Sequence, residues 1–449
     1  MKIWRPSVSV RGLLLLLAAG NGVTGQTAPP PVLTVEDAVA LAMKGNRRIR
    51  SSDLDVRRAA EGTATAKTQR LPQFSLYLLG GETLQPIDFT IPRGVLGFYP
   101  STGPIPARSS TITTPQTFTS VILGQTTQPI SQLWKIHLGL MESRIGEQLA
   151  QESLRKQKQG TAHSVRDLYY QIAQTQSQIE SAEANVKYLV DLAAETDRNV
   201  AEQAALKADI LAVRAKLSQQ RYQLLTLRNS IESQKESLNQ LLGRDLNMPF
   251  SVEAQPVPSA AEIDIAAARE EARNQRPEIR QARLQTKKAE LEVRRQRAEY
   301  IPDFSAHFTY FSIPNVSFLP QNIMQAGFLL QWQPFDWGQK RHKVESLKDS
   351  FKQTSLTEQD AEQQVMLDVN TKFRKLAEAR ALLDTSALSQ EAEREKRRVF
   401  ANRYSQKAVL LSDVLQQEAA VAQADTDYQK ALAAFWDAKA SFDYALGRD

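Results

Sequence analysis

The residue types that usually do chemistry in proteins are few and scattered in this sequence. The four histidines, His137, His163, His307 and His342, do not have the spacing of metal ligands. There are no cysteines, which excludes disulfides, thiolate metal sites and a lipidated N-terminal cysteine. We find neither a glycine-rich phosphate loop nor the tight turn that carries a catalytic serine. The sequence therefore predicts no catalytic residue, no cofactor and no metal site, and a protein that is not an enzyme.

The N-terminal residues have the features of a secretory signal peptide. Lys2, Arg5 and Arg11 precede or flank a short run of leucines and alanines, and small residues precede a cleavage site before Gln26. Residues 1–25 contain these three cations and no acid, so the formal net charge of +6 becomes +3 in the mature chain. This charge does not indicate nucleic-acid binding. The leader predicts a chain that leaves the cytoplasm.

The chain contains an internal duplication of about 200 residues. The matching segments are 71–75 and 301–305, 128–130 and 333–335, and 242–245 and 446–449. We place the first repeat at 26–246, a proline-containing linker at 247–260, and the second repeat at 261–449. The linker is expected to cross outside the helices. A two-copy chain usually builds a pseudo-symmetric structure.

Two long tracts favour helices. No proline lies between Pro129 and Pro249, and none follows Pro334, while residues that lose little freedom in a helix dominate both tracts. Apolar residues recur there every seven positions. They are Val165, Ile172, Ile179, Val186, Ile210, Leu217, Leu224, Ile231 and Leu238, then Val369, Leu376, Leu383, Val414, Val421, Tyr428, Phe435 and Phe442. Sustained heptads predict coiled-coil packing, with an ordinary amphipathic helix pair as the alternative.

The helices are expected to be unusually long. One should run from about Trp134 to Gln203, roughly 100 Å at 1.5 Å per residue, and then reverse and return to Leu242. The second should run from about Gly338 to Tyr404 and return to Leu446. The helical hairpins are thus placed at about 131–243 and 336–447. Hairpins of this length suit a device that bridges a wide gap.

Each repeat also holds a strand pair, at about 73–127 and 303–334. The expected strands are 74–78, 117–123, 304–310 and 326–333, and the first intervening loop, about 82–116, is rich in Pro, Gly, Ser and Thr. Phe304, Phe308 and Trp332 share an apolar face, whereas His307 and Thr309 lie on the other. Apolar outside and polar inside is typical of a membrane barrel around a water-filled lumen. A soluble β-layer packed on helices is the alternative.

The strand count bears on the oligomeric state. Four strands cannot close a barrel, and an open sheet edge is not tolerated in lipid. Two chains would give a barrel of eight strands, and side chains fill the interior of a barrel of that size. Three chains would give twelve strands and leave room for a channel. The predicted fold class is mainly α with a membrane β-barrel: long coiled-coil helical hairpins plus four β-strands per chain, two structural repeats, and a trimeric 12-stranded barrel.

Several segments resemble those of the TolC-like outer-membrane efflux proteins, also called outer membrane factors. They are residues 33–42 with Asn46, 276–280, 333–338, and the Leu-Gly-Arg sequences at 242–244 and 446–448. The resemblance spans essentially the whole mature chain. It implies a trimeric barrel on a periplasmic helical tunnel that docks onto an inner-membrane pump through a periplasmic adaptor.

The resemblance also implies roles for the two helix reversals, as the periplasmic aperture and adaptor-docking tips. The residues are Asp209, Leu206, Lys207, Tyr404, Lys407, Val409 and Asp413. Val409 stands where some relatives have a gate arginine, Lys407 where a tip glycine is common, and Gln416 where a second acidic ring occurs. A gate held by the same ion pairs is therefore not expected. The alternative for each tip charge is a solvated turn residue.

Three tryptophans, Trp134, Trp332 and Trp337, lie where strands are expected to meet helices. Such residues are expected to anchor a barrel at the membrane interface. Burial between helices is the alternative for Trp134 and Trp337.

The interpretation is a passive export duct of the outer membrane in a Gram-negative type envelope, with a long periplasmic portion. Its expected partners are two further copies of itself, a periplasmic adaptor (membrane fusion) protein, an inner-membrane efflux pump or ABC exporter for efflux or type I secretion, and outer-membrane lipid, but no nucleic acid. The alternative is a coiled-coil adaptor or structural tether without a pore. Two amphipathic strand pairs would serve no purpose in such a tether.

Overall fold

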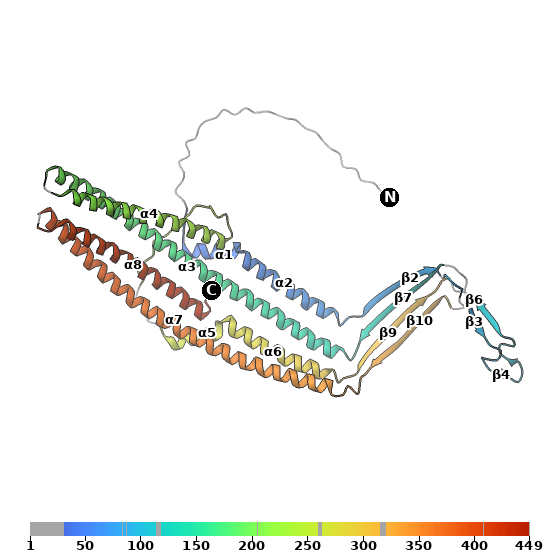
Figure 1. Cartoon of the computed structure of the whole chain (residues 1–449). Helices are drawn as coiled ribbons and strands as arrows, with labels where there is room; N and C mark the ends of the chain where they lie inside the picture. The colour runs from blue at the N-terminus through green and yellow to red at the C-terminus, as the bar shows by residue number, and fades with distance from the viewer. Residues whose placement is uncertain are drawn as a thin grey trace, which may run out of the picture.

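The computed structural model describes residues 31–82, 84–86, 88–113, 118–203, 205–258, 263–314, 320–406 and 408–448. The expected signal peptide, Lys407 and the end of the expected linker lie outside these residues. The chain is elongated, with a long helical part joined at a bend to a β-sheet (Figure 1).

The two halves of the chain contain elements of nearly equal length in the same order. The first half has helices α1 (Val35–Gly45), α2 (Arg47–Thr68), α3 (Leu133–Ala201) and α4 (Lys207–Leu242), with strands β2 (Gln73–Glu82) and β7 (Phe118–Pro129) between α2 and α3. The second half has α5 (Ile265–Gln275), α6 (Pro277–Ala298), α7 (Gln339–Ser405) and α8 (Leu411–Leu446), with β9 (Asp303–Ser312) and β10 (Asn322–Gln331) between α6 and α7. The helices have 11, 22, 69 and 36 residues in the first half and 11, 22, 67 and 36 in the second.

The long helices form one curved layer. Helix α3 packs against α2 and α4 on one side and against α6 and α8 on the other, and α7 packs against α6 and α8. The layer therefore has two open edges, one formed by α2 and α4 and the other by α7. No helix among the described residues has the length and apolar composition needed to cross a membrane.

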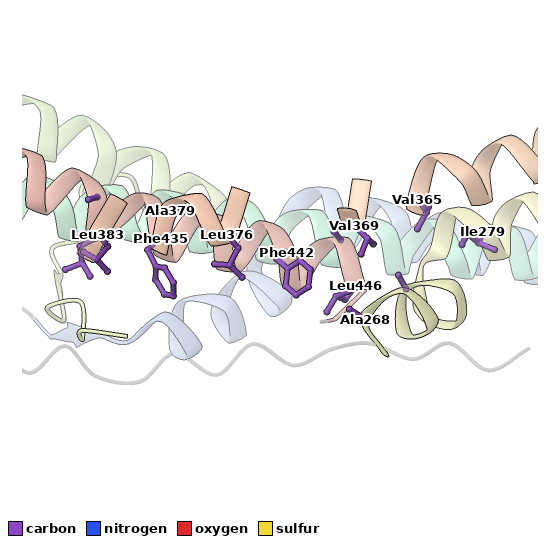
Figure 2. Packing of buried hydrophobic residues seen from close by; sticks show 14 residues of the cluster. Ala268, Ile279, Val365, Val369, Leu376, Ala379, Leu383, Phe435, Phe442 and Leu446 are labelled. Carbon is purple, nitrogen blue, oxygen red and sulfur yellow. The ribbon is translucent and has the colours of Figure 1, made fainter. Parts of the chain in front are cut away.

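The heptad residues form the core of this layer. Val165, Ile172 and Val369 are fully buried, and Phe435 and Phe442 belong to a cluster that joins α5 to α8 (Figure 2). Leu224, in the middle of the α4 series, is only half-buried. The seven-residue pattern thus identified the packed faces of the helices, while the depth of burial varies along them.

The paired Leu-Gly-Arg sequences end the returning helices. Gly243 and Gly447 have φ of +72° and +79°, the left-handed conformation that favours glycine at a helix end. A Cβ on Gly243 would lie 2.2 Å from the carbonyl oxygen of Gly45 at the end of α1, and a Cβ on Gly447 would lie 3.0 Å from the carbonyl carbon of Gln275 at the end of α5. In each half, glycine is therefore required both for the turn and for close packing on a short helix.

The main sheet has four antiparallel strands in the order β10-β9-β7-β2. The strands have 10, 10, 12 and 10 residues in that order, longer than the expected segments. Cross-strand pairing places Phe304 opposite Leu330 and Phe308 opposite Ala326, so the predicted apolar face is continuous across β9 and β10. Trp332, which was expected inside the strand at 326–333, lies one residue beyond the end of β10.

The expectation of only four strands was wrong. The loop after β2 contains two further antiparallel pairs, β3 (Asp88–Ile91) with β6 (Ser110–Thr113) and β4 (Phe98–Tyr99) with β5 (Gly103–Pro104). They project beyond the main sheet (Figure 1). A short parallel pair, β1 (Val32–Leu33) with β8 (Ser251–Val252), was also missed. Runs of two to four residues are too short for an alternating pattern to show.

The chain between the two halves crosses three helices. The Gln255 side chain donates to the backbone oxygen of Tyr170 on α3, the Trp436 indole of α8 donates to the backbone oxygen of Pro256, and Arg380 of α7 donates to that of Pro258. This segment therefore ties α3, α8 and α7 together from one face of the helical layer.

The junction between helices and sheet is held by polar contacts. Ser131 Oγ donates to the backbone oxygen of Pro302 and accepts from the Phe304 amide, both at 2.7 Å. Lys135, whose side chain is 12% exposed, pairs with Asp303 at 2.7 Å and Glu299 at 3.4 Å. These contacts fix the start of α3 against the start of β9.

Candidate functional site

The two helix reversals lie side by side at the end of the molecule opposite the sheet (Figure 1). We call residues 202–209 and 406–413, between α3 and α4 and between α7 and α8, the hairpin tips. Helix α3 ends at Ala201 and is followed by Gln203 with φ of +59°, and the N-cap residues of α4 and α8, Leu206 and Leu410, are extended. The two returning helices therefore start in a similar way.

Asp209 and Asp413 have equivalent positions in the two tips. The carboxylate of Asp209 accepts from the Leu206 amide at 2.9 Å, and that of Asp413 accepts from the Leu410 amide at 3.2 Å. Each carboxylate also lies in the first turn of its helix, where the helix dipole favours negative charge. Both aspartates are half-buried, and each stabilises the start of its returning helix.

Each tip exposes one large apolar side chain among polar ones. Leu206 and Leu410 are each 71% exposed. Lys207 is exposed, Val409 is half-buried, and Lys407 lies outside the described residues. The sequence reasoning named Leu206 and missed Leu410, although the 204-residue spacing between Asp209 and Asp413 also relates these two leucines.

Tyr404 joins the two hairpins near their tips. It packs in a cluster with Leu192 of α3, Val213 of α4 and Leu415 of α8. Its hydroxyl interacts with Thr196 and Asn199 of α3, and burial raises the pKa of this hydroxyl. The structure therefore brings Tyr404 into the apolar contact between hairpins, within one protomer.

Two short ion pairs near the tips connect helices of the same hairpin. Arg214 of α4 pairs with Asp197 of α3 at 2.8 Å, and Arg394 of α7 pairs with Asp425 of α8 at 2.8 Å. Close to the tips, ion pairs therefore lie inside each hairpin and an apolar contact lies between the two hairpins.

A buried carboxylate, that of Glu418, lies on α8 a little more than one turn beyond Asp413. Glu418 is 4% exposed, its Oε1 has no hydrogen-bond partner, and Arg397 of α7 lies 4.0 Å away. Burial raises the pKa of Glu418, and the Arg397 charge only partly opposes this. The negative field of Glu418 also adds to burial in raising the pKa of Tyr188 on α3 to about 12. Sequence reasoning missed Glu418, although it lies four residues after Val414 and three before Val421 and so shares the buried helix face of these two heptad residues.

The three tryptophans are exposed in the protomer at the helix–sheet junction. Trp134 in the first turn of α3 is 55% exposed, and Trp332 and Trp337 between β10 and α7 are 59% and fully exposed. Trp134 stacks on His137 with ring centroids 5.9 Å apart. No group of histidines and acids among the described residues could hold a metal ion.

Comparisons with known proteins agree on one fold. Residues 268–448 match the family model for outer membrane efflux proteins. No curated protein matches the sequence significantly.

Three solved structures illustrate the likeness. The outer-membrane channel OprN is 16% identical with a TM-score of 0.76, covering 92% of this chain and 90% of OprN. CusC, described as forming a transmembrane channel, is 15% identical with a TM-score of 0.77, covering 95% and 96%. The CmeC outer membrane channel of Campylobacter jejuni is 14% identical with a TM-score of 0.75, covering 97% and 94%.

The family match covers the second half of the chain, and the structural likeness covers nearly all of it. Residues 268–448 therefore belong to the outer membrane efflux protein family, and the whole chain has the fold of the outer-membrane channels.

Proposed function

We propose that the protein is the outer-membrane channel of a tripartite efflux or type I secretion system. In this role three copies form a passive export duct that docks with a periplasmic adaptor and an inner-membrane pump. Proteins of this family are passive channels and not enzymes. Energy for export then comes from the pump, because nothing in the sequence indicates a nucleotide site.

The observation that carries the proposal is the open sheet. Strands β2 and β10 are its two edges, and every residue of β10 is exposed. In lipid, unpaired backbone groups on a sheet edge cost several kcal/mol each, so the edges must find partners. Because β2 and β10 run in opposite directions, β10 of one copy can pair antiparallel with β2 of the next. Three copies then close a barrel of twelve strands.

The helical layer has edges that fit the same assembly. Helix α7 exposes Leu356 and Leu367 at 60% and 55%, and on the opposite edge α2 exposes Leu54 at 62% and α4 exposes Leu225 at 56%. Leu367 lines a hollow of about 690 Å³ on α7, and Leu54 lines one of about 510 Å³ beside α2. Packing α7 of one copy against α2 and α4 of its neighbour would cover these leucines and close a helical tunnel below the barrel.

The hairpin tips are proposed as the closed end of this tunnel and as the adaptor-docking surface. Exposed Leu206 and Leu410 offer apolar contacts to an adaptor, while Asp209 and Asp413 bring six carboxylates to the end of a trimer. The tryptophans at the helix–sheet junction are placed to anchor the barrel at the periplasmic membrane interface.

The proposal is tested on the full-length protein extracted from membranes in detergent. Native mass measurement should give three copies of the chain, and the protein should produce stable ion conductance in planar lipid bilayers. A stable monomer that gives no conductance would contradict the duct and support the alternative of a tether without a pore.

A further inference from the structure

One face of the sheet changes character along its length. In the half nearer the helices it is polar: Ser75, Gln125, Thr309 and Gln325 lie opposite one another across all four strands. One row closer to the helices, Thr127 and His307 contact through Oγ1 and Nδ1 at 3.1 Å on the same face. This is the face that lines the lumen in the proposed barrel, because the opposite face carries Phe304, Phe308 and Phe328.

The next row on this face, further from the helices, is apolar on every strand. Tyr77 of β2 lies opposite Leu123 of β7, Leu123 opposite Phe311 of β9, and Phe311 opposite Ile323 of β10. The following row continues the pattern, with Leu79 opposite Val121. Alternation along a strand keeps residues two apart on one face, so these side chains share the face of Gln125 and Thr309.

On β9 and β10 the opposite face becomes more polar at the same level, whereas Ile122 of β7 and Leu78 of β2 keep it apolar on the other two strands. Ser312 and Asn322 lie opposite each other there, and both the Ser312 and the Tyr310 hydroxyls donate to Asn322 Oδ1, at 3.0 and 2.8 Å. If lipid contact alone decided where apolar residues lie, the outer face would be the more apolar one at this level and the lumen face the more polar one. The apolar row is therefore not a continuation of the membrane-facing surface.

We propose that Tyr77, Leu123, Phe311 and Ile323 form an apolar band inside the barrel that binds the apolar part of exported organic solutes. The inference rests on the proposed trimeric duct and assigns a site within it. Three copies contribute twelve side chains. Because barrel strands tilt by about 35–45°, each row runs obliquely and the three rows make a band, not a flat ring.

The chemistry of the lining supports this occupant. The rows formed by residues 75, 77, 123, 125, 309, 311, 323 and 325 contain no charged side chain, so they offer nothing that holds a bare ion by charge. An apolar constriction disfavours water and hydrated ions. A solute with alkyl or aromatic surface gains roughly 25 cal/mol for each Å² it buries there. The band thus favours amphipathic solutes over small inorganic ions.

Block of the conducting pore tests the site with two related cations. Decyltrimethylammonium has an alkyl tail, whereas tetramethylammonium has the same head group without it. The wild-type pore in planar bilayers should be blocked by decyltrimethylammonium and not by tetramethylammonium at equal concentration. In the Leu123→Gln/Phe311→Gln variant the concentration for half-block should rise about tenfold or more, because the tail loses its apolar contacts.

A matched control changes the adjacent polar row. Gln125→Ser/Thr309→Ser alters two paired lumen-facing residues one row away and should leave the block unchanged. Where the double glutamine variant does not assemble, Ile323→Thr keeps a β-branched residue on edge strand β10 and should weaken the block by a smaller factor.

The outcomes separate this site from the proposed function. A conducting wild-type pore whose block is the same in all variants, or is lost equally in the control, overturns the apolar band and leaves the duct intact. A wild-type protein that forms no conducting pore overturns the duct and the band together. Selective loss of block in the apolar-row variants supports both.

Discussion

At the residue scale, Asp209 and Asp413 each have two expected effects, one on helix stability and one on ion selectivity, and a single type of substitution would not separate them. Each carboxylate accepts a backbone hydrogen bond at the start of a helix, and each adds a negative charge to the proposed constriction. Removing the whole carboxylate changes both. Asparagine keeps an oxygen acceptor of the same size and removes only the charge.

We therefore predict different outcomes for two double variants. Asp209→Asn/Asp413→Asn should lower cation selectivity in planar bilayers, because six carboxylates near one axis favour cations, while thermal stability stays close to wild type. Asp209→Ala/Asp413→Ala should lower selectivity to the same extent and also lose about 0.5–2 kcal/mol of stability at each helix start. Unchanged selectivity in both would mean that the aspartates face an adaptor or neighbouring helices.

Gly243 supports a second prediction. Gly243→Ala should lower stability by at least about 1–2 kcal/mol, because φ is +72° and the new Cβ would lie 2.2 Å from Gly45 O. Gly146→Ala is the matched control, since a Cβ there meets nothing within 4 Å in the interior of α3, and alanine favours the helix. Thermal unfolding of both proteins measures the difference. Equal melting temperatures would contradict this prediction, because they would mean that the ends of α1 and α4 can move apart to admit the Cβ without a loss of stability.

The sequence predicted where the site residues lie but not all of their contacts. It identified both tips, because a seven-residue pattern broken between Gln203 and Asp209 indicates a reversal. It did not reveal that Asp209 and Asp413 cap helices, which depends on turn geometry. Nor did it reveal Glu418, whose burial arises from the approach of α7 and α3.

At the element scale, the depth of burial decides which heptad positions stabilise the helices most. Leu238→Asp should cost about 3 kcal/mol or more, because Leu238 is fully buried and the new carboxylate would have no partner there. Leu211→Asp, at a position 55% exposed on the same helix, is the control. Chemical denaturation in detergent compares the two. Similar losses would contradict the burial assigned to α4.

Glu418 makes the stability of the α7–α8 hairpin depend on pH. Burial raises its pKa in the folded state above the ordinary value of 4.5, so the folded chain binds the proton more tightly than the unfolded chain. The stabilising contribution of Glu418 is therefore fully present below pH 4.5, the ordinary pKa, and is lost as the pH rises through the raised pKa of the folded state. Glu418→Gln should therefore raise the melting temperature at neutral pH, with the gain vanishing toward pH 4.5. A gain that is equal at both pH values would mean that Gln acts through packing.

The elements themselves were largely predictable, for specific reasons. Helix α3 was expected from about 134 to 203 and runs from Leu133 to Ala201. The prediction was close because this tract has no proline and its seven-residue pattern continues over many turns. Strand β10 was expected at 326–333 and runs from Asn322 to Gln331, since its start lacks clear alternation. The pairs β3·β6 and β4·β5 were missed, because a segment rich in proline and glycine favours irregular structure.

At the scale of the whole molecule, trimer formation should depend on residues that the single chain leaves exposed. Leu356→Glu/Leu367→Glu places charge on the open edge formed by α7, where both leucines are more than half exposed. The protomer should fold normally, whereas the trimer should dissociate in detergent, as native mass measurement would show. Leu356→Met/Leu367→Met keeps an apolar edge and should remain trimeric. A trimer that survives the glutamates would place the interface elsewhere.

The nearly equal lengths of the elements in the two halves have an evolutionary consequence. A chain of half this length, with two main strands and one helical hairpin, would need six copies to supply twelve strands. Fusing two such units lets neighbouring positions around the ring diverge. Arg244 now stacks on Phe250, with its guanidinium 4.8 Å from the ring centroid, while its counterpart Arg448 pairs with Glu271 at 2.7 Å. The fused chain can thus present two different surfaces in alternation around the ring, a distinction that six identical subunits could not encode.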